Sequence, residues 1–341
     1  MMRVAGRCLI LLADAYRSGL ALFFAIIGPR ASYRIGAVLA GVLYRLLEPL
    51  QKLSESHISA ALGTRLSGPQ IARMGKRAFI HRAWSHVDLL IARYRVSTRT
   101  FAAVGGRIDE HHLRLIRDAQ ARSQSLILVT CYYGPFDLLP VFLGYNGVRA
   151  CVVYKPHANR RFDRFRNKVR QKSGCRVVPI ASAIKPITQT LESGGAAALV
   201  ADHPAEGKGS VPITFLGVPT TAVRSVGLLA WRYKAAVVVA GIRRIDERFR
   251  FRLVVADMFG PSDWQEESDP VVYITQRYVR GLERIVLDDP SQYLWGYCRW
   301  GRRDYTGADT AQDSVTDPAG LSHSHADGSD WQPPSHLPVQ P

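Results

Sequence analysis

From about residue 108 onward, short runs of β-branched and apolar residues alternate with segments of helical periodicity. The candidate strands cover 125–130, 150–153, 176–180, 197–201, 235–242 and 249–255, and helical patterns fall between them at 135–143, 160–172, 183–193 and 223–233. Such alternation is typical of a mixed, mainly parallel sheet flanked by helices. The last strand begins with alternating polar and apolar residues, which predicts a half-exposed strand near an edge.

The rest of the chain differs from this pattern at both ends. Residues 30–95 read as Ala- and Leu-rich helices with basic faces, with Trp84 and Leu89 among the buried candidates, and 270–286 reads as a last helix. The final residues, 306–341, hold five Asp and no Lys or Arg. We therefore predict a helical N-terminal region (1–100), an α/β domain (101–305) and a disordered tail (306–341).

The formal net charge of +17 predicts attraction to a polyanion, either nucleic acid or an anionic membrane surface. No zinc-finger, helix-turn-helix or RNA-binding signature is present, so nucleic acid is not an expected partner. Residues 8–28 are mostly apolar but are interrupted by Asp14 and Arg17, which disfavours a spanning helix. No small-residue cleavage site follows this stretch. The pattern favours an interfacial membrane anchor, and a helix packed on the core is the alternative.

Five scattered cysteines form no CxxC or CxxH pair. This spacing predicts neither a metal site nor a disulfide framework, and it fits reduced thiols in a cytoplasmic setting.

The first candidate site is the turn after the strand at 125–130. Gly134 allows an unusual backbone conformation, and Pro135 suits the first position of a helix. Asp137 then falls in the first helical turn, beyond the carboxyl end of a strand, where open α/β sheets bind ligands. The alternative is that Asp137 only satisfies free helix N–H groups.

Two further candidate sites follow later strands. Lys155 and Asn159 precede a basic helix that includes Arg170 and suits phosphate groups, although a solvated basic helix is the alternative. After the strand at 197–201 come Asp202 and His203, a Gly/Lys loop at 207–209, and the segment 211–220. Adjacent residues on a strand face opposite ways, which argues against Asp202 and His203 acting on one another.

These segments resemble the lipid A late acyltransferase (lauroyl/myristoyl transferase) family of the lysophospholipid acyltransferase superfamily. The first motif of that family is His, four residues, then Asp or Glu. Aligned on it, Tyr132 occupies the His position, Gly134 the Gly, Phe136 the Trp and Asp137 the acidic position. A closing block at 289–300 is similar to the family's last motif, so the resemblance covers about 125–303 in order.

The resemblance implies that Tyr132 and Asp137 stand where the family has its general base and the carboxylate that orients it. A phenol titrates near pH 10 and is a poor base. Three alternatives follow: a histidine enters from elsewhere, namely His203 or His157; Tyr132 or the thiol of Cys131 takes part; or the protein binds lipid without catalysis. The substrate-binding residues implied by the resemblance are Gly134, Lys155, Asn159, Arg170, Asp202, Phe215 and Gly217.

The resemblance also implies a glycerolipid acyltransferase-like fold with an N-terminal helical membrane-associated segment. The expected activity is transfer of a fatty acyl group from acyl carrier protein or acyl-CoA to a hydroxyl or amine of a lipid or glycolipid acceptor. The expected place is the cytoplasmic face of a bacterial inner membrane, and no metal or redox cofactor is required. A catalytically inactive lipid-binding member of the same fold is the alternative.

Overall fold

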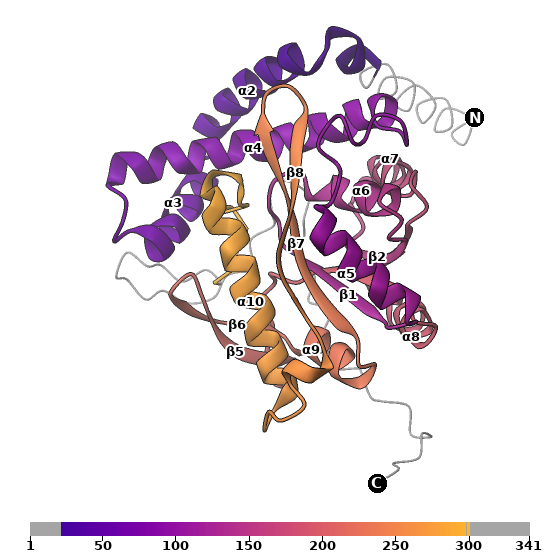
Figure 1. The fold of residues 1–341 in the computed structure, drawn as a ribbon. Helices are drawn as coiled ribbons and strands as arrows, with labels where there is room; N and C mark the ends of the chain where they lie inside the picture. Colours follow the sequence, from indigo (N-terminus) through magenta and orange to yellow (C-terminus); the bar gives the residue numbers. More distant parts are fainter. Residues whose placement is uncertain (1–21, 298, 301–341) are drawn as a thin grey trace, which may run out of the picture.

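The computed structural model describes residues 22–297 and 299–300, and its centre is a six-stranded sheet (Figure 1). The strand order is β3-β2-β4-β1-β7-β8. Neighbouring strands are parallel except β7 and β8, which form an antiparallel pair at one edge. The strands are β1 (Leu126–Thr130), β2 (Ala150–Tyr154), β3 (Arg176–Pro179), β4 (Ala196–Val200), β7 (Ala236–Asp246) and β8 (Arg250–Phe259). The predicted mainly parallel sheet and its half-exposed edge strand are therefore confirmed.

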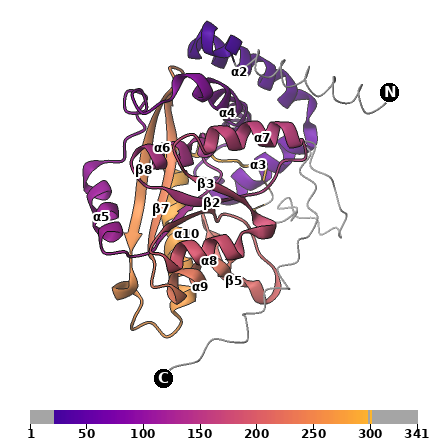
Figure 2. The ribbon, with the colours of Figure 1, turned by 90° about the vertical axis from the view of Figure 1, so that its right-hand side faces the viewer.

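Helices cover both faces of the sheet because its strands are apolar on both sides (Figure 2). Leu126 and Leu128 of β1 face one core, and Ile127 and Val129 face the other. The first core includes residues of α4 (Gly68–Arg95), α5 (Glu110–Ala121), α6 (Leu139–Tyr145) and α7 (Arg160–Arg170). The second includes residues of α8 (Ile184–Glu192), α9 (Arg224–Arg232) and α10 (Pro270–Asp288).

A β-hairpin that the sequence pattern did not predict also packs into the second core. It consists of β5 (Ser210–Phe215) and β6 (Val218–Val223). Pro212 and Pro219 argue against strands, but both are exposed on this separate two-stranded ribbon, where proline is tolerated. Leu216 and Gly217 form the turn with φ of 52° and 80°, the positive values that a two-residue hairpin loop requires.

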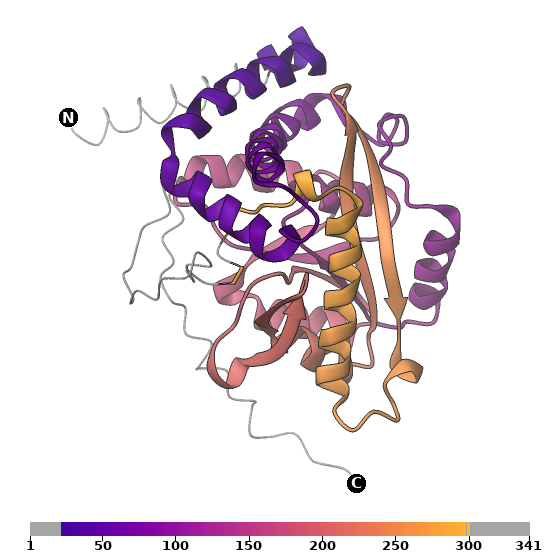
Figure 3. The ribbon, with the colours of Figure 1, turned by 90° about the vertical axis from the view of Figure 1, so that its left-hand side faces the viewer.

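After the helical residues 22–27, the N-terminal part of the described chain continues with α2 (Pro29–Leu46), α3 (Glu48–Leu62) and α4. Figure 3 shows α2 as an outer layer beside α4. The predicted helices are confirmed, and Trp84 and Leu89 are buried. Within residues 22–297 and 299–300, no helix combines the length and apolar character that crossing a bilayer requires. Most of the predicted anchor at 8–28 and the whole predicted tail at 306–341 lie outside the described residues.

A buried polar cluster joins α2 and α4 to the sheet. Asp88 of α4 accepts hydrogen bonds from the hydroxyl of Tyr33 on α2 and from the guanidinium of Arg244 on β7. A second Arg244 nitrogen lies 2.9 Å from Nδ1 of His81. Because a buried ion pair resists losing either partner, this cluster fixes α4 relative to the sheet. The same helix carries Arg82, Ser85 and His86.

Candidate active site

The loop after β1 takes its shape from two distant parts of the chain. The N–H of Gly134 donates to the carbonyl of Gln292 (2.9 Å), and the N–H of Leu294 donates to the carbonyl of Tyr132 (3.0 Å). From the other side, Oγ of Ser85 on α4 donates to the Gly134 carbonyl (3.0 Å). The closing block therefore holds the first motif in place through backbone hydrogen bonds.

Gly134 is the residue that makes this close approach possible. Its φ is 53°, and a Cβ added there would lie 2.2 Å from the carbonyl oxygen of Ile242. Only glycine accepts both the positive φ and the contact. The expectation of an unusual backbone at this turn is confirmed.

Tyr132 lies in an aromatic cluster at the carboxyl end of β1. Its ring is edge-on to Phe136, His203 and Tyr297, with centroids 5.0, 5.2 and 5.3 Å away. Its backbone N–H donates to Oδ2 of Asp202 (3.0 Å). Burial, and then the Asp202 carboxylate, raise the pKa of the Tyr132 phenol above its ordinary value. The phenol therefore stays protonated at neutral pH and is suited to donate a hydrogen bond, not to remove a proton.

Asp202 and His203 both contact Tyr132. They follow β4, which ends at Val200, in a loop, so the strand geometry assumed from the sequence does not apply to them. That they do not act on one another stays a prediction. Asp202 is buried and binds the Tyr132 backbone, while Nδ1 of His203 lies 2.8 Å from the hydroxyl of Tyr297. The loop thus brings a carboxylate and an imidazole to the residue that replaces the family's histidine.

Cys131 is completely buried beside this cluster. Burial, and then the Asp202 carboxylate, raise the pKa of its thiol. A protonated, inaccessible thiol is not a nucleophile. These pKa shifts argue against removal of a proton by Tyr132 or Cys131, but a protonated Tyr132 can still take part as a hydrogen-bond donor.

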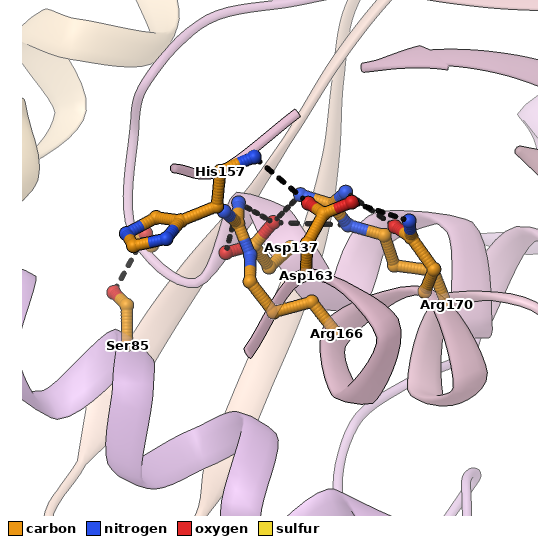
Figure 4. A network of polar contacts seen from close by, with 8 residues as sticks. Ser85, Asp137, His157, Asp163, Arg166 and Arg170 are labelled. Carbon is orange, nitrogen blue, oxygen red and sulfur yellow. Dashed lines mark hydrogen bonds and ion pairs between the residues drawn. The ribbon is translucent and has the colours of Figure 1, made fainter. Parts of the chain in front are cut away.

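Asp137 lies in the short helix η1 (Phe136–Leu138), and its carboxylate is bound by two guanidinium groups (Figure 4). Nη2 of Arg166 lies 3.0 Å from Oδ1, and Arg170 binds the same oxygen. Burial alone would raise the pKa of Asp137, but Arg170, Arg166 and Arg82 outweigh it and hold that pKa well below its usual range. The carboxylate is paired with side chains of α7 instead of with helix N–H groups.

The residues predicted in the second motif shape the start of α7. Oδ1 of Asn159 accepts hydrogen bonds from the N–H groups of Arg161 and Phe162 (both 3.1 Å), so Asn159 is the N-cap of the helix. The N–H of His157 donates to Asp163 (2.9 Å), whereas Lys155 is exposed. Arg170 is the member of this motif that reaches Asp137.

Two residues of α4 near Asp137 were not predicted from the sequence. The Arg82 guanidinium lies 5.5 Å from the ring centre of Phe136, and it acts electrostatically on Asp137. His86 packs against Phe162, with ring centres 5.7 Å apart. Burial, and then Arg82, lower the pKa of His86 to about 3. The sequence pattern that could have identified them is a set of polar residues within a helix whose neighbouring positions are apolar: His81, Arg82, Ser85, His86 and Asp88.

A small pocket of about 10 Å³ lies beside Tyr132. It is lined by Ala78, Arg82, Ser85, Tyr132, Gly134, Phe136, Gln292, Tyr293 and Leu294. This volume is about what one water molecule needs, so a substrate must displace the lining side chains to enter. Tyr132 and Gly134 therefore line one pocket, and Asp137 is not among the residues that line it.

Phe215 and Gly217 lie apart from this pocket. Phe215 is fully buried and packs on Tyr293 and Trp300, with ring centres 6.0 and 5.9 Å away. Gly217, with its φ of 80°, belongs to the hairpin turn. Neither lines the pocket beside Tyr132, and both have structural places in the hairpin; their substrate-binding role stays a prediction.

The sequence matches the family model of bacterial lipid A biosynthesis acyltransferases over residues 55–302. The chain belongs to this family. It is also 23% identical over 183 residues to the lipid A biosynthesis acyltransferase of Haemophilus influenzae, an alignment that covers 54% of this chain and 56% of that protein. The chain thus spans about half the length of this curated relative. The resemblance inferred from the motifs is confirmed, and with it the replacement of the motif histidine by Tyr132 becomes the main chemical question.

Proposed function

We propose that this family member transfers a fatty acyl group from an acyl carrier protein or acyl-CoA to a hydroxyl or amine of a lipid or glycolipid acceptor. The observation that carries the proposal is the position of His203, whose ring packs directly on the residue that replaces the motif histidine. Family membership supports the reaction class, and the imidazole that the loop after β4 brings to Tyr132 supports His203 as the base.

In this mechanism His203 is the general base. If Nδ1–H donates to the Tyr297 oxygen, the basic lone pair lies on Nε2. Nε2 removes the proton of the acceptor hydroxyl, the hydroxyl oxygen bonds to the thioester carbon, and the carbon–sulfur bond breaks. The imidazolium then returns the proton to the departing thiolate. Tyr132, held protonated, donates a hydrogen bond to the oxyanion that forms on the thioester carbonyl.

We place the reaction at the cytoplasmic face of a bacterial inner membrane. Sixteen large hydrophobic residues are exposed in the described part of the chain, and nine of them fall within residues 22–46. On α2 they recur at helical spacing: Ile35, Val38, Leu39, Val42, Leu43 and Leu46. Arg34 and Arg45 are exposed on the same helix. An apolar helix face with adjacent cations suits the interface of an anionic bilayer.

The test is acyl transfer by the purified full-length protein, with carrier-protein and CoA thioesters as donors and a panel of glycolipid and lysophospholipid acceptors. Loss of a general base lowers kcat by about 10²–10⁴. We expect this loss for His203→Gln, a loss of about 10²–10³ for Tyr132→Phe, which removes the oxyanion donor, and no change for His111→Gln on the exposed surface of α5. A wild type without activity that gains it on Tyr132→His would overturn the proposal.

One observation favours a second candidate, an inactive lipid-binding protein. The carboxylate of Asp137 is bound by two arginines and does not line the pocket, so it has no contact with a bound acceptor in this conformation. In that case wild type, His203→Gln, Tyr132→Phe and His111→Gln all consume no donor, whereas the protein still binds lipid vesicles.

A further inference from the structure

A groove of about 730 Å³ lies at the free edge of the sheet, where β3 is the last strand. It is formed by β3, the short helix η2 (Ile180–Ser182) and the start of α8. Its lining runs along the whole of β3, and because η2 follows Pro179, one end of the groove lies at the carboxyl end of β3. Because β1 to β4 are parallel, Tyr132 after β1 and Asp202 after β4 lie at this same end of the strands.

The side chains around the groove combine apolar and cationic groups. Ile180 and Ile184 are each 56% exposed. Arg176 and Lys185, which are also exposed, line the groove. Exposed isoleucines flanked by cations resemble the apolar centre and charged rim of a transient protein interface.

The chain around the groove is almost uniformly basic. Residues 146–192 contain eleven Lys or Arg and two acidic residues: Asp163, which is buried and hydrogen-bonded to His157, and Glu192, which is exposed at the end of α8. The exposed cations of this segment are Arg149, Lys155, Arg160, Arg164, Lys168, Arg176 and Lys185. A surface of one sign attracts a partner of the opposite sign and raises its association rate.

A protein fits this surface better than a bilayer does. Figures 1 and 2 show α8 towards the opposite end of the molecule from α2, whose apolar face we assign to the membrane. A groove is also concave, whereas a bilayer surface is flat. From β3 to β1 there are three strand spacings, roughly 14 Å. A thioester on a flexible prosthetic arm can cross such a distance, and the body of its carrier remains in the groove.

We propose that the groove of β3, η2 and α8 binds a small acidic carrier protein that presents the acyl thioester to the loop after β1. This inference rests on the proposed acyl transfer and adds the surface on which the carrier of the donor docks. It assigns Arg176 and Lys185 to carrier recognition and Ile184 to the apolar centre of the contact.

Binding of a purified holo acyl carrier protein to the full-length chain tests this without any turnover. We expect binding that weakens as the salt concentration rises from about 0.05 to about 0.5 M. Arg176→Glu with Lys185→Glu weakens it about tenfold or more, and Ile184→Ser also weakens it. The matched controls are Arg114→Glu with Arg117→Glu and Leu115→Ser, on the exposed surface of α5, and they leave binding unchanged.

Transfer assays separate failure of this inference from failure of the proposed function. We expect the Arg176/Lys185 variant to raise KM for the carrier-protein donor while transfer from acyl-CoA is unaffected. If wild type transfers from acyl-CoA but binds no carrier protein, or if both pairs of charge reversals weaken binding equally, the docking surface is wrong and the acyltransferase proposal stands. The inference is also wrong if the groove variant loses binding of anionic vesicles or RNA but keeps binding of the carrier.

Discussion

Nη2 of Arg166 lies 3.0 Å from Oδ1 of Asp137, and both side chains are at least nine-tenths buried. With Arg170 bound to the same oxygen, the acidic residue of the first motif is joined to the basic helix of the second. The carboxylate thus aligns α7 with the loop after β1. Whatever part Asp137 takes in catalysis, it also has a structural role.

Removing the Asp137 carboxylate should destabilise the fold. Asp137→Ala leaves two buried guanidinium groups without their counter-charge, and breaking a buried pair in this way costs about 3–5 kcal/mol. Chemical denaturation measures the free energy of unfolding. In the double variant Asp137→Ala with Arg170→Met, the loss is smaller than the sum of the two single losses, because one charge of the cluster is removed with its partner. Additive losses would show that the pair is not coupled.

Gly134→Ala should be far more damaging than an alanine at another glycine of positive φ. The new Cβ would lie 2.2 Å from the Ile242 carbonyl oxygen, so the loop must shift and lose its bonds to Gln292 and Ser85. The control is Gly147→Ala, with φ of 88° and no atom within 4 Å of the added Cβ. We expect the control to lower the free energy of unfolding by about 1–2 kcal/mol, the cost of a positive φ at alanine. Gly134→Ala should lower it by more than about 3 kcal/mol, because the steric clash adds to that cost. Equal losses would mean that the loop accommodates the methyl group.

The buried imidazole of His86 should make the protein sensitive to acid. Its folded-state pKa is about 3, below the value of about 6.5 in an unfolded chain. Between these two pKa values the unfolded state binds more protons than the folded state. The free energy of unfolding is therefore unaffected by His86 above about pH 6.5 and decreases as the pH falls below that value. His86→Leu removes this term. At pH 7.5 the difference in free energy of unfolding between His86→Leu and wild type reports the packing change alone. At pH 5 this difference should shift in favour of the variant by up to about 2 kcal/mol. An unchanged pH slope would contradict the low pKa.

The apolar face of α2 should bind anionic vesicles. Val38 and Leu39 are 66% and 64% exposed, and replacing both with Ser removes apolar area that the bilayer would cover. We expect sedimentation with vesicles containing phosphatidylglycerol to weaken about tenfold or more. The matched control, Ile245→Ser with Leu287→Ser, removes exposed side chains from β7 and α10 and leaves binding unchanged. Equal effects of the two pairs would place the membrane surface elsewhere.

The strands of the central sheet could be predicted from sequence because burial on both faces makes them continuous apolar runs. The hairpin of β5 and β6 could not, since its prolines lie on the exposed side of a ribbon outside that sheet. Helix α5 was missed as well, because only Leu113, Ile116 and Ala119 are buried along it.

The candidate site was predictable only in part, for a similar reason. Motifs identified Tyr132, Asp137, Asp202 and His203, each of which follows a strand closely. Their partners come from distant segments. Arg82 and His86 of α4 interact electrostatically with Asp137, and Tyr297 of the closing block contacts His203. Local spacing carries no information about such pairings, which depend on how helices cross the sheet.

The hydrogen bonds from the closing block to the loop after β1 have a consequence for biosynthesis. A nascent chain leaves the ribosome N-terminus first, so β1 is available long before residues 292–294. Until those residues emerge, the carbonyl of Tyr132 and the N–H of Gly134 have no backbone partner at this position. The pocket therefore reaches its final form only after residues 292–294 have emerged, and a chain truncated after α9 would keep strands β1 to β4 but lack this pocket.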